Sequence, residues 1–151
     1  MNIPENLLQE YPFKSHYINV SDNYRLHYVD EGDGDPILMV HGNPTWSFTF
    51  RNFIKEFQKN SRVVVPDHIG CGLSDKPQNY SYQLKDHIDN LEALVNHLGL
   101  KNITLIVHDW GGAIGFGLAT RAPENIKKIV ILNTAAFRSP HIPFRINLCR
   151  F

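Results

Sequence analysis

Hydrophobic residues alternate with polar ones near the start of the chain. Residues 14–20 and 24–30 are rich in Tyr, Val and Ile, and the turn-forming sequence Ser-Asp-Asn separates them at 21–23. A period of two indicates a strand with one buried face, and a short polar connection joins neighbouring antiparallel strands. We therefore expect an antiparallel hairpin over these residues. The sequence GDGDP at 32–36 then breaks the chain, because Gly and Pro interrupt regular structure.

Beyond this break the pattern changes to short, continuous apolar runs that are rich in β-branched residues. They lie at 37–40, 63–65, 103–107 and 129–132. Such runs are typical of strands in a parallel sheet whose two faces are both covered.

Helical patterns separate the apolar runs. Apolar residues with helical spacing occur at Phe50, Phe53, Ile54 and Phe57, and a second stripe extends from residue 84 to 98. A third helix is expected over 110–121, ended by Pro123. Strands that alternate with helices predict an α/β fold with right-handed crossovers.

The loop after the 103–107 run carries the strongest chemical signal. A strand, one polar residue and then glycines that open a helix are the layout of a nucleophile elbow, and here the sequence is VHDWGG at 107–112. Asp109 stands where the G-x-S-x-G pattern has serine, so the sequence argues against an esterase or lipase. A free Asp carboxyl has a pKa of about 3.9, so it is charged at neutral pH without an activating base. It suits displacement at carbon to give a covalent ester. The alternative is that Asp109 only caps the following helix.

Two further residues are candidates for stabilising a developing or departing anion. Asn43 lies in HGNPT at 41–45, after the first parallel strand. Its backbone N–H and that of Trp110 are expected to form an oxyanion hole. Their side chains add N–H donors that suit a leaving group such as halide. The alternatives are an Asn-Pro turn for Asn43 and a core anchor for Trp110.

The remaining candidates give weaker signals. Asp67 and Asp75 flank a Gly-rich turn and are expected to bond local backbone. Gly70-Cys71-Gly72 has no following G-K-[ST], so it does not indicate a phosphate loop, and no base lies beside Cys71 in the sequence. The histidines show no metal-ligand spacing, and we expect ordinary surface or half-buried positions for four of them, His16, His27, His87 and His97. No metal or cofactor is expected.

Composition and charge narrow the function classes. Hydrophobic residues make up 42% of the 151 residues, and 15 Lys and Arg balance 15 Asp and Glu. This balance, without a basic block, argues against nucleic acid or an anionic membrane surface as a partner. Two cysteines favour a reducing compartment, the N-terminus does not resemble a signal peptide, and no apolar run is long enough to span a bilayer. We expect a cytoplasmic location.

These motifs resemble the haloalkane dehalogenase group of the α/β-hydrolases over nearly the whole chain. The sequences PDHIGCGLSDKP at 66–77 and LNTAAF at 132–137 are most similar to one branch, the β-lactone decarboxylases of bacterial olefin biosynthesis. These enzymes convert cis-3,4-dialkyl-oxetan-2-ones to cis-alkenes and CO2. The resemblance implies Asp109 as nucleophile, Asn43 and Trp110 as leaving-group or oxyanion stabilisers, and a small apolar substrate. It also implies possible partner enzymes of a lipid or olefin pathway.

The resemblance covers the N-terminal half of such an enzyme. Residues 1–137 are expected to form the N-terminal part of the α/β-hydrolase core, and 138–151 the start of a truncated cap region. The catalytic His and acid are expected beyond Phe151, because only His141 follows Asp109. The strand at 129–132 would normally be covered by later elements of the fold, so in this chain we expect it to form an exposed apolar edge. The main hypothesis is β-lactone decarboxylation, and haloalkane dehalogenation through an alkyl-enzyme ester is the alternative. A truncated, non-catalytic domain is the alternative of another class.

Overall fold

The chain forms a mixed sheet of six strands in the order β1-β2-β4-β3-β5-β6. This computed structural model describes Leu7 and residues 9–134. The strands are β1 (Ser15–Val20), β2 (Tyr24–Glu31), β3 (Pro36–Val40), β4 (Arg62–Pro66), β5 (Ile103–His108) and β6 (Ile126–Leu132).

The strand directions confirm the fold expected from the sequence. β1 and β2 pair in antiparallel register around the 3-10 turn η1 (Ser21–Asn23), and β2 also pairs antiparallel with β4. The strands β4, β3, β5 and β6 are parallel to one another. An antiparallel hairpin therefore leads into a mostly parallel sheet, as the change from alternating to continuous apolar runs predicts.

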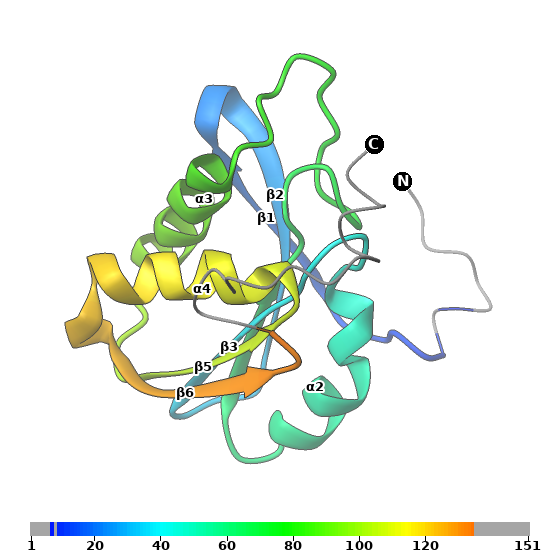
Figure 1. Ribbon diagram of the computed structural model, residues 1–151. Coiled ribbons are helices and arrows are strands. Elements are labelled where there is room, and N and C mark those ends of the chain that lie inside the picture. The colour runs from blue at the N-terminus through cyan, green and yellow to red at the C-terminus, as the bar shows by residue number, and fades with distance from the viewer. Residues whose placement is uncertain (1–6, 8, 135–151) are drawn as a thin grey trace, which may run out of the picture.

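Helices cover both faces of this sheet. α3 (Leu84–His97) and α4 (Trp110–Arg121) lie on one face, and α2 (Arg51–Phe57) lies on the other (Figure 1). The 3-10 turns are η2 (Ser47–Phe50), which leads into α2, and η3 (Pro123–Asn125), which precedes β6. The stripe predicted for the first helix is only partly correct, because Phe50 and Ile54 are buried whereas Phe53 is exposed.

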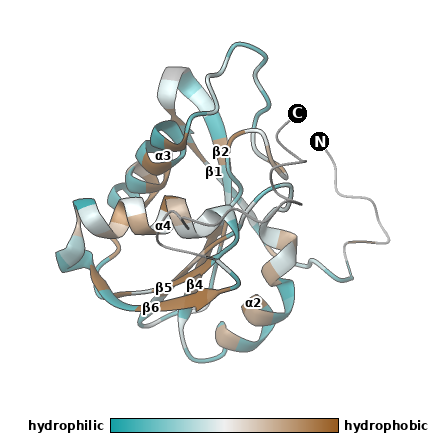
Figure 2. Cartoon of the chain, in the orientation of Figure 1, coloured by the Kyte–Doolittle hydropathy of each residue, from teal (hydrophilic) through white to brown (hydrophobic). Residues whose placement is uncertain are grey.

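The two faces explain why the central strands are continuously apolar. Successive side chains of a strand point to opposite faces. In β3, Leu38 packs in the cluster that includes Leu91 and Leu94 of α3, whereas the neighbouring Met39 packs in the cluster that includes Ile54 of α2. Figure 2 shows the resulting concentration of hydrophobic residues in the sheet.

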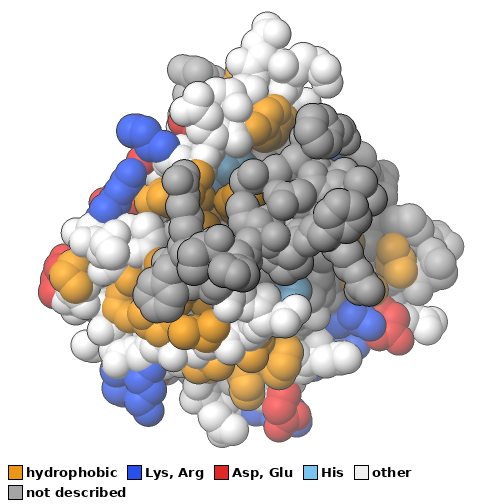
Figure 3. Space-filling view, in the orientation of Figure 1, with side chains coloured by type: hydrophobic (Ala, Val, Ile, Leu, Met, Phe, Trp, Pro, Cys, Tyr) orange, Lys and Arg blue, Asp and Glu red, His pale blue; other side chains and the backbone are white. Residues whose placement is uncertain are grey.

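β6 differs from the other parallel strands. It begins three residues before the apolar run expected at 129–132, and Ile129, Val130 and Ile131 are 39%, 40% and 54% exposed. β6 is the last strand of the sheet, so the expected exposed apolar edge is confirmed, and hydrophobic side chains gather on the surface near β6 in Figure 3. The expected cap segment 138–151, with His141, lies outside the described residues. No described helix is both long and apolar enough to cross a membrane.

Candidate functional site

Asp109 lies in a sharp turn between β5 and α4. Its backbone has φ 51° and ψ −129°, a conformation that non-glycine residues rarely adopt and that occurs preferentially at functional sites. The carbonyl oxygen of Asp109 accepts hydrogen bonds from the Gly112 N–H at 2.9 Å and from Thr134 Oγ1 at 2.6 Å. The Asp109 side chain makes no capping hydrogen bond to α4. This geometry is that of the predicted elbow and disagrees with a mere helix cap.

The glycines around the elbow permit close packing between three chain segments. A Cβ atom on Gly111 would overlap the carbonyl oxygens of Val40 and His41 at the end of β3. A Cβ atom on Gly42 would overlap the side chain of Asp109. Small residues at these two positions therefore allow the loop after β3 to lie directly against the elbow.

The loop after β3 brings a backbone donor to Asp109. The Asn43 N–H donates to Asp109 Oδ1 at 3.0 Å, and the Asn43–Pro44 peptide bond is cis. One carboxylate oxygen is thus held by the first predicted oxyanion donor. A role for the Trp110 backbone N–H stays a prediction.

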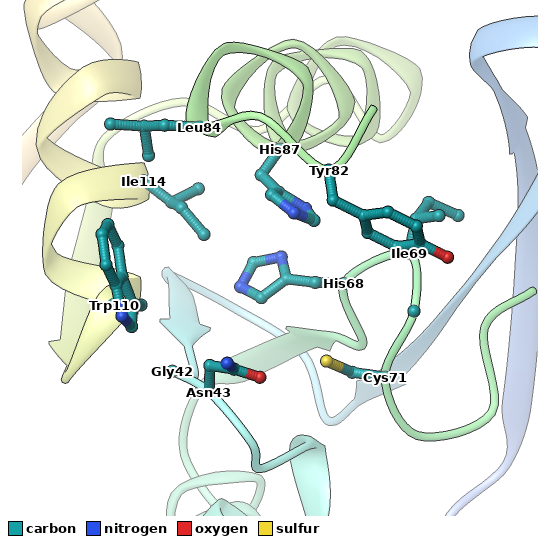
Figure 4. Close-up of a pocket in the computed structure, with 11 residues that line it drawn as sticks. Gly42, Asn43, His68, Ile69, Cys71, Tyr82, Leu84, His87, Trp110 and Ile114 are labelled. Atoms are coloured by element: carbon teal, nitrogen blue, oxygen red, sulfur yellow. The ribbon is translucent and has the colours of Figure 1, made fainter. Parts of the chain in front are cut away.

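A pocket of about 510 Å³ opens beside this loop. Figure 4 shows Asn43, Trp110 and His68 around it, with Tyr82 and His87 on the other side. Its lining comprises Gly42, Asn43, His68, Ile69, Gly70, Cys71, Tyr82, Leu84, His87, Trp110 and Ile114. Trp110 is 58% exposed, so its interpretation as a core anchor is wrong. The apolar and aromatic share of the lining suits an apolar ligand.

Asp109 itself borders a second, smaller pocket. This pocket has a volume of about 280 Å³ and is lined by Asp109, Trp110, Ala113, Asn133 and Thr134. Trp110 lines both pockets, whereas Asp109 lines only the smaller one.

Asp67 and His27 form a buried pair that the sequence did not reveal. Both side chains are 0% exposed, and His27 Nδ1 lies 2.9 Å from Asp67 Oδ2. On the other side of the ring, His27 Nε2 lies 3.0 Å from Ser15 Oγ. The expectation that His27 is a surface or half-buried residue is therefore wrong. A histidine at one position of an alternating strand gives no signal of an aspartate 40 positions later.

The Asp67 carboxylate also ties two loops together. Its Oδ1 accepts the Ser47 N–H at 2.8 Å, and its Oδ2 accepts the Leu73 N–H at 2.8 Å. Burial raises the pKa of Asp67, but His27 and these N–H groups outweigh burial and leave the pKa below its usual value. Asp67 is therefore a buried anion whose bonds extend beyond its local backbone.

The surroundings of Asp75 and Cys71 favour structural roles for both residues. The Asp75 carboxylate accepts the Arg25 N–H at 2.8 Å and pairs with the Arg25 guanidinium at 3.1 Å, so the partners of its side chain lie on β2. Burial raises the pKa of the Cys71 thiol, which disfavours the reactive thiolate.

Two more histidines lie at the base of the site. His41 and His68 are buried, their ring centroids are 4.3 Å apart, and burial lowers the pKa of both. The ring centroid of His87 lies 5.5 Å from that of His68, and His87 is only partly buried, as expected. Within the part of the chain that the structure describes, no three His, Cys, Asp or Glu side chains cluster in a way that could hold a metal ion.

The sequence resembles proteins of known activity. A cis-3-alkyl-4-alkyloxetan-2-one decarboxylase from Shewanella oneidensis is 54% identical over 145 residues, which cover 92% of this chain and 45% of that protein. Haloalkane dehalogenase 2 from Mycobacterium tuberculosis is 42% identical over 126 residues, with 83% and 44% coverage. This chain thus spans less than half the length of these relatives.

A solved structure and a family model agree with these similarities. The tetrameric haloalkane dehalogenase from Paraglaciecola agarilytica has a TM-score of 0.87 and 33% identity, covering 98% of this chain and 54% of that one. Residues 35–148 match the model of the alpha/beta hydrolase fold. Because this match includes well over half of the residues, the chain belongs to the family with the alpha/beta hydrolase fold.

Proposed function

We propose that this chain carries the nucleophile of a cofactor-free enzyme that decarboxylates β-lactones with two alkyl substituents. One observation carries the proposal: a carboxylate stands at the nucleophile elbow, with one of its oxygens 3.0 Å from the Asn43 N–H. The 54% identity to a cis-3-alkyl-4-alkyloxetan-2-one decarboxylase supports the choice of substrate class.

Among the described residues, the structure gives a hydrogen-bond donor to only one of the two carboxylate oxygens of Asp109, which supports different roles for the two oxygens. The Asn43 N–H holds Oδ1, and Oδ2 is the oxygen that we assign to attack on carbon. After attack, Oδ1 becomes the carbonyl oxygen of the ester. A donor already aimed at this oxygen stabilises negative charge that develops there in a later step.

For a β-lactone, we propose a cycle that needs only the carboxylate. Asp109 Oδ2 attacks ring carbon C4, the bond from C4 to the ring oxygen breaks, and the ring carboxylate is released at the other end of the substrate. The bond from C3 to this carboxylate then breaks to give CO2, its electron pair forms the alkene, and the Asp109 ester bond breaks. The aspartate is regenerated without water or an added proton.

Haloalkane dehalogenation is the second candidate. The side chains of Asn43 and Trp110 line the pocket and carry N–H donors suited to a departing halide, and a haloalkane dehalogenase is 42% identical. Here the alkyl ester of Asp109 must be cleaved by water. This step requires a general base, which typically contributes a factor of about 10²–10⁴. The base and its acid are the residues that the resemblance leads us to expect beyond Phe151.

The two candidates predict different products when this chain alone meets each electrophile. A cis-dialkyl β-lactone should give cis-alkene and CO2 with recovery of unmodified protein. A primary bromoalkane should give one equivalent of bromide and a protein heavier by one alkyl group. Gas chromatography and intact-protein mass spectrometry distinguish these results, and Asp109→Asn is the control. Alkylation by the bromoalkane without turnover of the lactone would favour the second candidate, and reaction with neither would contradict both.

A further inference from the structure

His41 and His68 form a reciprocal pair of hydrogen bonds beneath the loop that carries Asn43. The His68 backbone N–H donates to His41 Nε2 at 3.1 Å, and His68 Nε2 lies 3.0 Å from the His41 carbonyl oxygen. Because His41 Nε2 accepts a hydrogen bond, the ring proton belongs on Nδ1. We call these two residues the histidine clasp.

The clasp acts on the same peptide group that reaches Asp109. His41 Nδ1 donates to the Gly42 carbonyl oxygen at 2.7 Å, and Thr45 Oγ1 donates to it at 3.0 Å. This carbonyl and the Asn43 N–H belong to one planar peptide unit and point in opposite directions. Anchoring the oxygen therefore fixes the direction of the N–H that donates to Asp109.

We propose that His41 and His68 are positioning residues that, as neutral rings, orient the Gly42–Asn43 peptide so that its N–H meets Asp109. The relevance of this orientation to catalysis rests on the proposed function. The hydrogen-bond geometry itself does not depend on that function. Protonation of His41 would place a second ring proton on Nε2, directly against the His68 N–H. The clasp would then open and the peptide would lose its anchor.

The surroundings of the clasp favour its neutral form. Burial is the largest influence and lowers the pKa of both rings. Among the charged and titratable groups facing His41, Asp67 raises its pKa, while His87 of α3 and His108 of β5 lower it. For His68, the neighbouring His41 and His87 lower the pKa further.

Hydrogen exchange at the Asn43 amide tests this proposal directly. His41→Asn keeps an N–H donor near the position of Nδ1 and cannot titrate, whereas His41→Leu has a similar size and no donor. Mass spectrometry on overlapping peptides that end on either side of Asn43 isolates its amide. We expect exchange on the order of tenfold faster in His41→Leu than in His41→Asn at neutral pH, from the loss of one hydrogen bond. Peptides from β5 report whether the fold is intact.

The pH dependence provides the second arm, and its main measurement uses the natural chain. After correction for the intrinsic exchange rate, protection of the Asn43 amide should fall on acidification in the natural chain and stay constant in His41→Asn. Asp109→Ala should remove this protection in either case, because it removes the acceptor.

Equal protection in His41→Leu and His41→Asn with β5 intact, or no loss of protection on acidification of the natural chain, would overturn the proposal. Neither readout uses a substrate, so failure of the proposed function would leave these outcomes unchanged.

Discussion

Asp67 and Asp109 occupy equivalent places in the sheet and have opposite surroundings. Each directly follows a parallel strand, β4 or β5, near its carboxyl end. Asp67 is 0% exposed and is bonded by His27 and by two backbone N–H groups. Asp109 is exposed, has strained backbone angles and borders a pocket.

This contrast shows how the fold separates structural from chemical roles. A fully buried carboxylate whose two oxygens both accept hydrogen bonds is inaccessible to a substrate. A carboxylate on a strained turn beside a pocket keeps one oxygen for attack. The position after a parallel strand therefore indicates a candidate, and its burial and donors determine which role it has.

The largest expected effect is that of Asp67→Asn on stability, and the same substitution at Asp109 is its matched control. Asp67→Asn should lower the free energy of unfolding by about 3–5 kcal/mol, because it replaces a buried carboxylate that accepts several hydrogen bonds and directs amide protons toward backbone N–H groups. Asp109→Asn should change it by less than about 1 kcal/mol, as expected for an exposed site. Urea unfolding followed by circular dichroism measures both values. Similar losses of stability at the two positions would contradict the assignment of a structural role to Asp67 and not to Asp109.

A smaller effect is expected from tightening the packing beneath Asp109. Gly111→Ala should cost about 1–3 kcal/mol, because the new methyl group would meet the backbone oxygens of Val40 and His41, which cannot rotate away. Gly117→Ala in the same helix is the milder control, since the nearest atoms that its methyl group would meet belong to the Ile88 side chain and not to the backbone. Thermal unfolding of the two variants should separate them, and equal midpoints would contradict close packing at the elbow.

Between pH 7 and 6, the smallest expected effect is a pH dependence of stability. Burial lowers the pKa of folded His41 and His68 below the usual 6.5, so the unfolded chain binds protons first. Stability should be constant above about pH 7 and should decline below pH 6.5, by at most about 1.4 kcal/mol per pH unit for each histidine. The lowered pKa of Asp67 adds a loss only below about pH 3.8. Urea midpoints from pH 8 to 5 test the first range, and a flat profile there would contradict it.

The sequence predicts the fold and the elbow because both depend on local patterns. The change of apolar period locates the hairpin and the parallel strands, and VHDWGG predicts the turn at Asp109, where the side chain indeed makes no helix cap. These features follow from the spacing of neighbouring residues, so a single sequence is enough to find them.

The supporting contacts could not be predicted in this way. The pairing of His27 with Asp67 depends on the antiparallel register of β2 and β4, and the contact of His41 with His68 depends on the parallel register of β3 and β4. Each joins residues that are far apart in the chain and have no distinctive local pattern.

Identifying the modified residue tests the central claim most directly. The chain is incubated with an activated bromoalkane, digested and sequenced by tandem mass spectrometry. We expect an alkyl ester on Asp109, its retention in a Gly117→Ala control and its loss in Asp109→Asn. An ester on Asp67 or elsewhere, or undiminished labelling of Asp109→Asn, would contradict the assignment of Asp109 as the nucleophile.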